Sequence, residues 1–311
     1  MYKKALLLFS YVLMFLSCKS YQENKLTDIK YSDFIQSQKK WLSPDGAISY
    51  IDKGEGIPIL LLHGVPTSGW LYRKMIDPLV ANGFRVIVPD MLGCGTSDSP
   101  KGYEIYDKKE HAKRILGLME YLQIPNWHHV MHDAGGLWTW ELEKLTPSRI
   151  NKLTILNTII YKEGFKPPVK ITEKRKTLAK LIKWSYSNKT NVMVYQLFKN
   201  GTDDFHMSHA DIKGYKVPLR GGKTESLGKF FKTNTESIPD YSEVLKSLHV
   251  PTQVIWGKND EILRWKPQSE RVMADLKIKE KDVHILSKNH FLQEEASTEL
   301  VAIISAFNSK K

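Results

Sequence analysis

The chain has 311 residues, of which 41% are hydrophobic and 11% aromatic. This is enough for one large domain with an insertion, and it excludes a disordered chain. Lysine and arginine exceed the acidic residues by 12. Such a charge favours anionic lipid or polymer nearby, but the lysines are scattered rather than interleaved with aromatic residues, so we expect no nucleic-acid binding.

The first 18 residues (1–18) have the pattern of a bacterial export signal. Two lysines precede an apolar run at 5–16, and the small residue Ser17 follows it. The run is shorter than the roughly 20 residues that a membrane-spanning helix needs. Because Ser17-Cys18 ends a stretch that resembles a lipobox, we expect lipidation of Cys18 and anchoring at the cell envelope. A secreted or periplasmic soluble protein is the alternative.

Beyond the signal, polar residues 19–42 predict a tether. Short aliphatic runs then alternate with helical patterns. Strands are expected at 57–62, 85–88, 127–131, 153–156, 251–256 and 283–286, and helices at 70–82, 107–123, 136–146, 267–276 and 293–308. This order predicts a doubly wound α/β core with a mostly parallel sheet, in two parts at 43–160 and 249–311, and a helical cap insertion at 161–248.

In such sheets, functional residues follow the carboxyl ends of the strands. After the strand at 57–62, Gly64 permits a tight turn and Pro66 removes a competing donor, which leaves the Val65 N–H free. A free backbone N–H at this place is typical of an oxyanion hole. We therefore expect Val65 to supply one of its donors.

The strand at 127–131 runs into a sharp turn with two glycines, in which Asp133 occupies the position of a nucleophile. A carboxylate there lies at a helix N-terminus, whose partial positive charge keeps it ionised. The N–H of Ala134 is expected to be the second oxyanion donor. The structural alternative for Asp133 is a helix cap.

Two more candidates follow later strands. Asp260 comes after the strand at 251–256 and His290 after the last strand. Each residue alone has an ordinary alternative, a turn for Asp260 and a helix cap for His290. Together with Asp133 they have the chain order nucleophile, acid, base that catalytic triads of α/β-hydrolase type require. The sequence therefore predicts a hydrolase.

With these motifs, the chain resembles the α/β-hydrolases that use an aspartate nucleophile, the haloalkane dehalogenases and epoxide hydrolases. The segments most similar to the dehalogenases are His63-Gly64-Val65-Pro66-Thr67, residues 89–98 and His290-Phe291-Leu292-Gln293-Glu294-Glu295. The resemblance implies the α/β-hydrolase fold and a small-molecule substrate. It also implies that Asp133 forms an alkyl-enzyme ester, which water activated by His290 and oriented by Asp260 then hydrolyses.

Two positions depart from the dehalogenase pattern. Ala134 replaces the tryptophan that holds the leaving halide, and Val65 replaces an asparagine donor. Trp184 of the cap is the remaining candidate for a halide donor. An epoxide hydrolase is the alternative, with tyrosines of the cap as donors to the epoxide oxygen, namely Tyr186, Tyr195 or Tyr215. A lactone or ester substrate ranks third, and a lipid-anchored binding protein without catalysis is a further alternative.

We expect no metal and no organic cofactor. Strand alternation directs His128 and His132 to one face of the sheet and His129 to the other, so the three do not converge on one ion. With Cys18 acylated, Cys94 is the only cysteine left, and no intramolecular disulfide forms.

Overall fold

The computed structural model describes residues 29–167, 176–188, 190, 192–204, 207–234 and 238–309. These residues contain one eight-stranded sheet with the order β1-β2-β4-β3-β5-β6-β7-β8. The strands are β1 (Lys39–Ser43), β2 (Gly46–Lys53), β3 (Ile57–Leu62), β4 (Phe84–Pro89), β5 (Trp127–Asp133), β6 (Ile150–Thr158), β7 (Thr252–Gly257) and β8 (Val283–Leu286). From β4 to β8 neighbouring strands are parallel, whereas β2 is antiparallel to both β1 and β4. The predicted doubly wound, mostly parallel sheet is confirmed.

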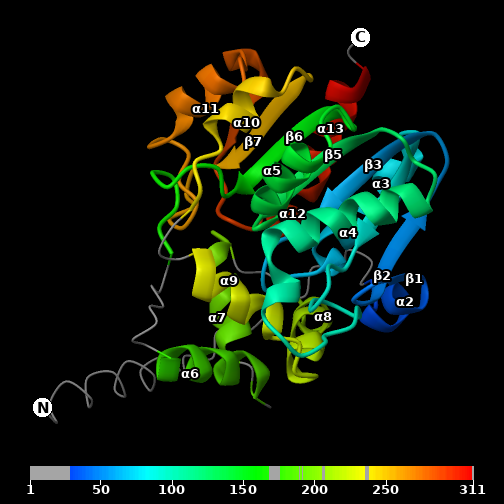
Figure 1. Cartoon of the computed structure of the whole chain (residues 1–311), viewed down its shortest axis with the longest axis vertical. Coiled ribbons are helices and arrows are strands. Elements are labelled where there is room, and N and C mark those ends of the chain that lie inside the picture. Colours follow the sequence, from blue (N-terminus) through cyan, green and yellow to red (C-terminus); the bar gives the residue numbers. More distant parts are fainter. Residues whose placement is uncertain are drawn as a thin grey trace, which may run out of the picture.

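Helices cover both faces of the sheet (Figure 1). One face carries α3 (Arg73–Ala81) and α13 (Ser297–Ser309), and the other carries α4 (Lys108–Tyr121) and α5 (Gly135–Leu145). The remaining elements are η1 (Gly69–Tyr72), η2 (Glu104–Tyr106), α10 (Ser242–Ser247), α11 (Ser269–Asp275), η4 (Glu280–Asp282) and α12 (Leu292–Glu295). The helices expected from hydrophobic periodicity are present at these places.

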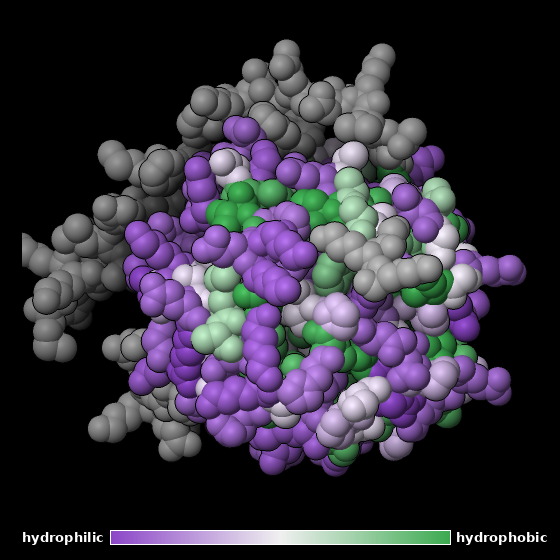
Figure 2. Space-filling model, turned by 90° about the horizontal axis from the view of Figure 1, so that it is seen from above, coloured by the Kyte–Doolittle hydropathy of each residue, from purple (hydrophilic) through white to green (hydrophobic). Residues whose placement is uncertain are grey.

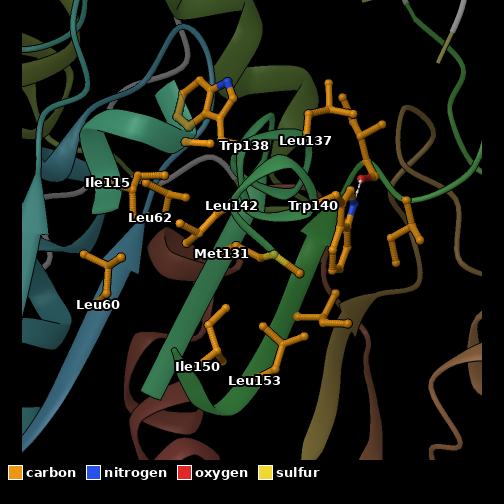
Figure 3. Close-up of a cluster of buried hydrophobic side chains, with 14 of the residues drawn as sticks. Leu60, Leu62, Ile115, Met131, Leu137, Trp138, Trp140, Leu142, Ile150 and Leu153 are labelled. Carbon is orange, nitrogen blue, oxygen red and sulfur yellow. Dashed lines mark hydrogen bonds between the residues drawn. The ribbon is translucent and has the colours of Figure 1, made fainter. Parts of the chain in front are cut away.

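Alternation along the strands divides the core into two layers. In β3, Leu60 and Leu62 face α4 and α5, whereas Ile59 and Leu61 face α3 and α13. Figure 3 shows the first layer, in which β5 and β6 direct apolar side chains toward α5. The indole N–H of Trp140 donates to the Ile159 carbonyl at 3.0 Å, which ties α5 to the chain after β6.

The predicted tether at 19–42 is wrong for its described part. Residues 31–36 form helix α2 (Tyr31–Gln36), and β1 pairs with β2 at the edge of the sheet. Tyr31 and Phe34 pack edge-to-face on Trp70, with ring centroids at 5.3 and 5.1 Å. Two aromatic side chains are enough to dock one short helix, so the polar composition of the segment concealed its order.

The predicted signal peptide at 1–18 and the lipidation site Cys18 lie outside the described residues, and both stay predictions. In the described part of the chain, no helix is both long and apolar enough to cross a membrane. The surface visible in Figure 2 is mostly hydrophilic, with apolar groups between the polar ones.

Between β6 and β7 the described residues contain helices only. Four of them, which we call the cap helices, are α6 (Lys176–Ser187), α7 (Val192–Gly201), α8 (His209–Arg220) and α9 (Glu225–Asn234). They are grouped away from the sheet, at the lower end of Figure 1. In contrast, α10 packs against α5 and α11, with Tyr241 and Leu245 in the core. The end of the stretch predicted as insertion therefore lies with the core helices.

Candidate active site

Asp133 ends β5 at the turn into α5. Its side chain is buried, and its φ of +51° is unusual for a residue other than glycine. Gly64 makes room for it, because a Cβ at position 64 would lie only 2.2 Å from Asp133 Oδ1. Such a strained turn with close backbone approach is a feature of functional sites.

Two backbone N–H groups donate to the Asp133 carboxylate. The Val65 N–H donates to Oδ1 at 2.8 Å, and the Ala134 N–H also donates to this carboxylate. Buried His63 supports the loop that carries Val65, since its Nδ1 lies 2.6 Å from the Gly64 carbonyl and its Nε2 accepts the Met91 N–H at 3.0 Å. The structure thus brings the two donors expected from the sequence to the Asp133 carboxylate.

The second oxygen of Asp133 faces His290. Nε2 of His290 lies 3.9 Å from Asp133 Oδ2, and Nδ1 lies 2.7 Å from Asp260 Oδ2. Oδ1 of Asp260 accepts the N–H groups of Ile262 and Leu263 at 2.9 and 2.8 Å. The three residues predicted to form a catalytic triad therefore meet, each from the end of a different strand.

Asn157, at the end of β6, is a further member of this cluster. Its Nδ2 donates to Asp260 Oδ2 at 2.7 Å, and its Oδ1 accepts the Gly257 N–H at 2.8 Å. The side-chain amide thereby connects the ends of β6 and β7 and orients the carboxylate that contacts His290. From the sequence, no role was assigned to Asn157, and its place at the carboxyl end of a buried strand was the available signal.

The three ionisable side chains shift one another's pKa. Burial raises the pKa of Asp133, against the opposing effects of His290 and the two N–H groups. Burial acts in the same direction on Asp260, but the charge of His290 and the hydrogen bonds from His290, Asn157 and Leu263 hold its pKa below the ordinary value. Burial lowers the pKa of His290, yet the two carboxylates outweigh burial and raise it. The two carboxylates therefore stabilise the protonated form of His290, whereas burial disfavours the charged form of Asp133.

The other histidines of β5 have structural partners. Nε2 of His132 lies 2.9 Å from the His290 carbonyl, and burial lowers the pKa of His132 to about 3, so this ring is neutral and supports the His290 backbone. His128 and His129 lie 2.8 Å from the hydroxyls of Thr154 and Thr139 respectively. Among the described residues, no cluster of His, Cys, Asp and Glu is arranged to hold a metal.

The cap helices close over the site through aromatic contacts. Phe198 of α7 packs on Phe291, next to His290, and on Tyr215 of α8, with ring centroids at 4.3 and 4.1 Å. The Phe291 N–H donates to the carbonyl of Gly201 at 3.0 Å. A cavity of about 10 Å³, room for one water molecule, lies between the Val65 loop and the cap. Its lining includes Pro66, Cys94, Gly214, Tyr215, Leu219 and Lys223.

The prediction that Trp184 binds substrate is wrong. Its side chain is 62% exposed on α6, because Tyr186 occupies the buried side of this helix, two residues and roughly 200° further round. Of the candidate tyrosines, Tyr186 and Tyr215 are buried and Tyr195 is 40% exposed. The Tyr215 hydroxyl lines the closed cap but donates to Glu294.

A buried ion cluster joins the core, the cap and the His290 segment. Arg73 of α3 pairs with Asp211 of α8 and with Glu294 of α12, the latter at 2.5 and 2.8 Å. Its guanidinium also lies over the Trp70 ring, 4.5 Å from the centroid. Because Glu294 is four residues after His290, this cluster, which the sequence did not reveal, fixes the segment that carries the histidine.

The chain is similar to several known proteins. The family model described as alpha/beta hydrolase fold matches residues 57–297. Haloalkane dehalogenase 2 of Mycobacterium bovis is 28% identical over 280 residues, covering 86% of this chain and 93% of that enzyme. A cis-3-alkyl-4-alkyloxetan-2-one decarboxylase of Shewanella oneidensis is 25% identical over 299 residues, covering 87% of this chain and 88% of that enzyme.

The fold also matches solved structures. An epoxide hydrolase from Vigna radiata superposes with a TM-score of 0.71 at 20% identity, covering 88% of this chain and 98% of that structure. At this identity the likeness concerns the fold alone. The family match, however, extends over more than half of the chain and includes the ends of β3, β5 and β7 with the His290 segment. The chain therefore belongs to the α/β hydrolase fold family of enzymes.

Proposed function

We propose that this enzyme attacks an electrophilic carbon with Asp133, forms an alkyl-enzyme ester, and hydrolyses it with water activated by His290. The observation that carries the proposal is that the two oxygens of Asp133 have different neighbours. Oδ1 accepts the Val65 N–H at 2.8 Å, while Oδ2 lies 3.9 Å from His290 Nε2, and the Ala134 N–H also donates to the carboxylate. The arrangement leaves Oδ2 as the attacking atom.

In the first step Oδ2 forms a bond to the substrate carbon, and the leaving group departs with the electron pair of the bond that breaks. In the second step His290 Nε2 takes a proton from water, and the hydroxide adds to the Asp133 carboxyl carbon. The negative charge that develops on Oδ1 lies at the two N–H groups, each such donor contributing roughly 3 kcal/mol in comparable sites. Collapse releases the alcohol, which receives the proton from His290, and Asp133, now a carboxylic acid that holds the oxygen of the water, loses its proton to solvent and is restored as the carboxylate.

The relatives suggest a haloalkane as the first candidate substrate. An epoxide is the second candidate, because the side chains of Val65 and Ala134 offer no donor to a leaving halide. An epoxide oxygen stays on the product and needs a proton, whereas a leaving halide needs hydrogen-bond donors that hold the anion. A strained lactone, the substrate class in the name of the Shewanella relative, belongs in the same test.

Replacing Asp133 with Asn is expected to lower turnover at least about a thousandfold, because the amide keeps the shape but loses the nucleophile. Product formation is measured on panels of haloalkanes, epoxides and strained lactones. Asp77→Asn, at an exposed site on α3, is the matched control and should behave like the wild type. Equal turnover by Asp133→Asn and wild type on every active substrate would end the proposal.

The two half-reactions, alkylation of Asp133 and hydrolysis of the ester, are expected to differ in their pH dependence. Alkylation needs ionised Asp133, whose pKa is raised by burial but starts from the acid range of carboxyl groups. Hydrolysis needs neutral His290, and although burial opposes the shift, Asp260 and Asp133 raise the pKa of His290. As pH falls, hydrolysis is therefore lost first and the ester accumulates. Rapid-quench mass spectrometry from about pH 4 to pH 9 measures this; identical pH dependences of both steps would contradict it.

A further inference from the structure

The end of the cap formed by α6 and α7 exposes large apolar side chains. On α6, Leu181 is 56% and Trp184 62% exposed, three residues apart and hence on one side of the helix. At the start of α7, Val192 is 51% exposed, and Met193 beside it is also exposed. These four residues lie on the second half of α6 and at the start of α7. We call them the hairpin patch.

The charge of the same segment is of one sign. Between residues 176 and 201, which bound α6 and α7, the chain has five lysines and no acidic residue. Lys180 is exposed on α6, within one turn of Trp184. Lys183 pairs with Glu225 of α9 at 2.5 Å. The patch therefore combines exposed apolar side chains with a local excess of positive charge.

Helix α6 has one buried side and one exposed side. Tyr186 is buried toward the other cap helices, and α6 packs mainly on α7, α8 and α9. In Figure 1, α6 lies at the lower end of the molecule, beyond α7 and α9 as seen from the sheet. The hairpin patch thus belongs to the outer side of the cap, away from the core.

We propose that the hairpin patch docks on the surface of an anionic lipid bilayer. Tryptophan and leucine on one side of a helix with lysine beside them match the requirements of the interface, where apolar side chains enter the headgroup region and lysines meet anionic lipid. A second copy of the chain fits less well, because a symmetric contact would bring together two copies of a segment that has five lysines and no acidic residue. The surface is independent of the predicted anchor at Cys18, since it consists of described residues of the cap.

Docking would also bring the membrane close to the proposed site. Helix α7 begins in the hairpin patch and ends at Gly201, whose carbonyl accepts the N–H of Phe291 beside His290. One helix of ten residues thus connects the lipid-facing end of the cap to the catalytic segment.

The test uses the full chain, vesicles of phosphatidylcholine with or without phosphatidylglycerol, and acyl-chain-brominated lipid that quenches tryptophan fluorescence on contact. Trp184 is the one tryptophan of the chain with an exposed side chain, the others being buried or partly buried. Quenching is expected with phosphatidylglycerol present and is expected to disappear in Trp184→Phe, which keeps the apolar surface. Binding through another part of the chain leaves Trp184 in water, so the difference in quenching between wild type and Trp184→Phe reports on the patch.

Two variants that retain Trp184 test the chemistry of the patch. Lys180→Glu and Leu181→Gln should each require about tenfold more anionic lipid for half-maximal quenching. Leu42→Gln, which removes an 80% exposed leucine on β1, is the matched control and should change nothing. Thermal melting followed by circular dichroism checks that each variant is folded.

Three results would overturn the proposal. Equal quenching in wild type and Trp184→Phe would show that Trp184 does not enter lipid. Quenching that is independent of phosphatidylglycerol would remove the role of charge. A lipid-free dimer that dissociates in Leu181→Gln, seen by sedimentation velocity, would show that the hairpin patch is instead an interface between copies.

Discussion

Replacing His290 with Gln is expected to stop the enzyme after a single turnover, with the substrate alkyl group bound to Asp133. The histidine does not take part in the attack by Asp133 Oδ2, so alkylation should persist. Hydrolysis should slow by at least about a thousandfold, because the amide of glutamine cannot take a proton from water. His290 Nδ1 lies 2.7 Å from Asp260, and His290 Nε2 lies 3.9 Å from Asp133 Oδ2. The histidine therefore stands between the acid and the nucleophile.

Intact-protein mass spectrometry of His290→Gln mixed with an active substrate should show one added alkyl group per chain. Peptide mapping should place it on Asp133. His249→Gln, an exposed histidine before β7, is the matched control and should turn over substrate normally. Continued turnover by His290→Gln would exclude His290 as the base. Loss of turnover without any adduct would mean that Asp133 is not alkylated, which contradicts the proposed first step.

Replacing Arg73 with Met is expected to lower the free energy of unfolding by about 3 to 5 kcal/mol, because it leaves the buried carboxylates of Asp211 and Glu294 without their common partner. The methionine retains most of the packing volume. Arg85→Met is the matched control: Arg85 pairs with Asp52 at a partly exposed site, and its loss should cost about 1 kcal/mol or less. Urea unfolding of the three proteins measures the difference.

The pH dependence of stability gives a second readout for the same cluster. Burial would raise the pKa of Glu294, but Arg73, Lys74 and a hydrogen bond from Tyr215 lower it to about 2. A depressed carboxyl pKa stabilises the fold above the ordinary value near 4.5, and this stabilisation is lost as pH falls toward 2. Without Arg73, burial is the dominant effect and raises the pKa of Glu294 instead of leaving it lowered. The loss of stability in Arg73→Met should therefore be largest near neutral pH and smaller in acid. A loss equal to that of Arg85→Met, or one that does not change with pH, would contradict this account of the cluster.

Local sequence patterns predicted the parallel strands well. The expected strands at 57–62 and 283–286 are short, mostly aliphatic runs between turn residues. They coincide with β3 and β8. Strands β1 and β2 were missed. Strand β1 (Lys39–Ser43) is mostly polar, lies at the sheet edge and depends on pairing with β2. Helix α2 was missed for a related reason, since its order depends on contact with Trp70 rather than on its own periodicity.

The order of Asp133, Asp260 and His290 along the chain was enough to predict that these three residues meet, because parallel strands bring their carboxyl ends to one edge of the sheet. Their roles in catalysis remain our proposal. The burial of Asn157, Glu294 and Arg73 could not be predicted, since each acts through a partner about 100 to 220 residues away. Such pairs leave no local pattern.

The sequence by itself therefore determined the α/β core, the elbow at Asp133 and the two N–H donors, because each depends on residue types within one strand and the turn after it. Only the tertiary structure decided what surrounds that elbow. It placed Asn157 on Asp260, tied the His290 segment to Arg73, and turned Trp184 outward to solvent, since the rotation of a cap helix is set by its packing against its neighbours and not by its own sequence alone.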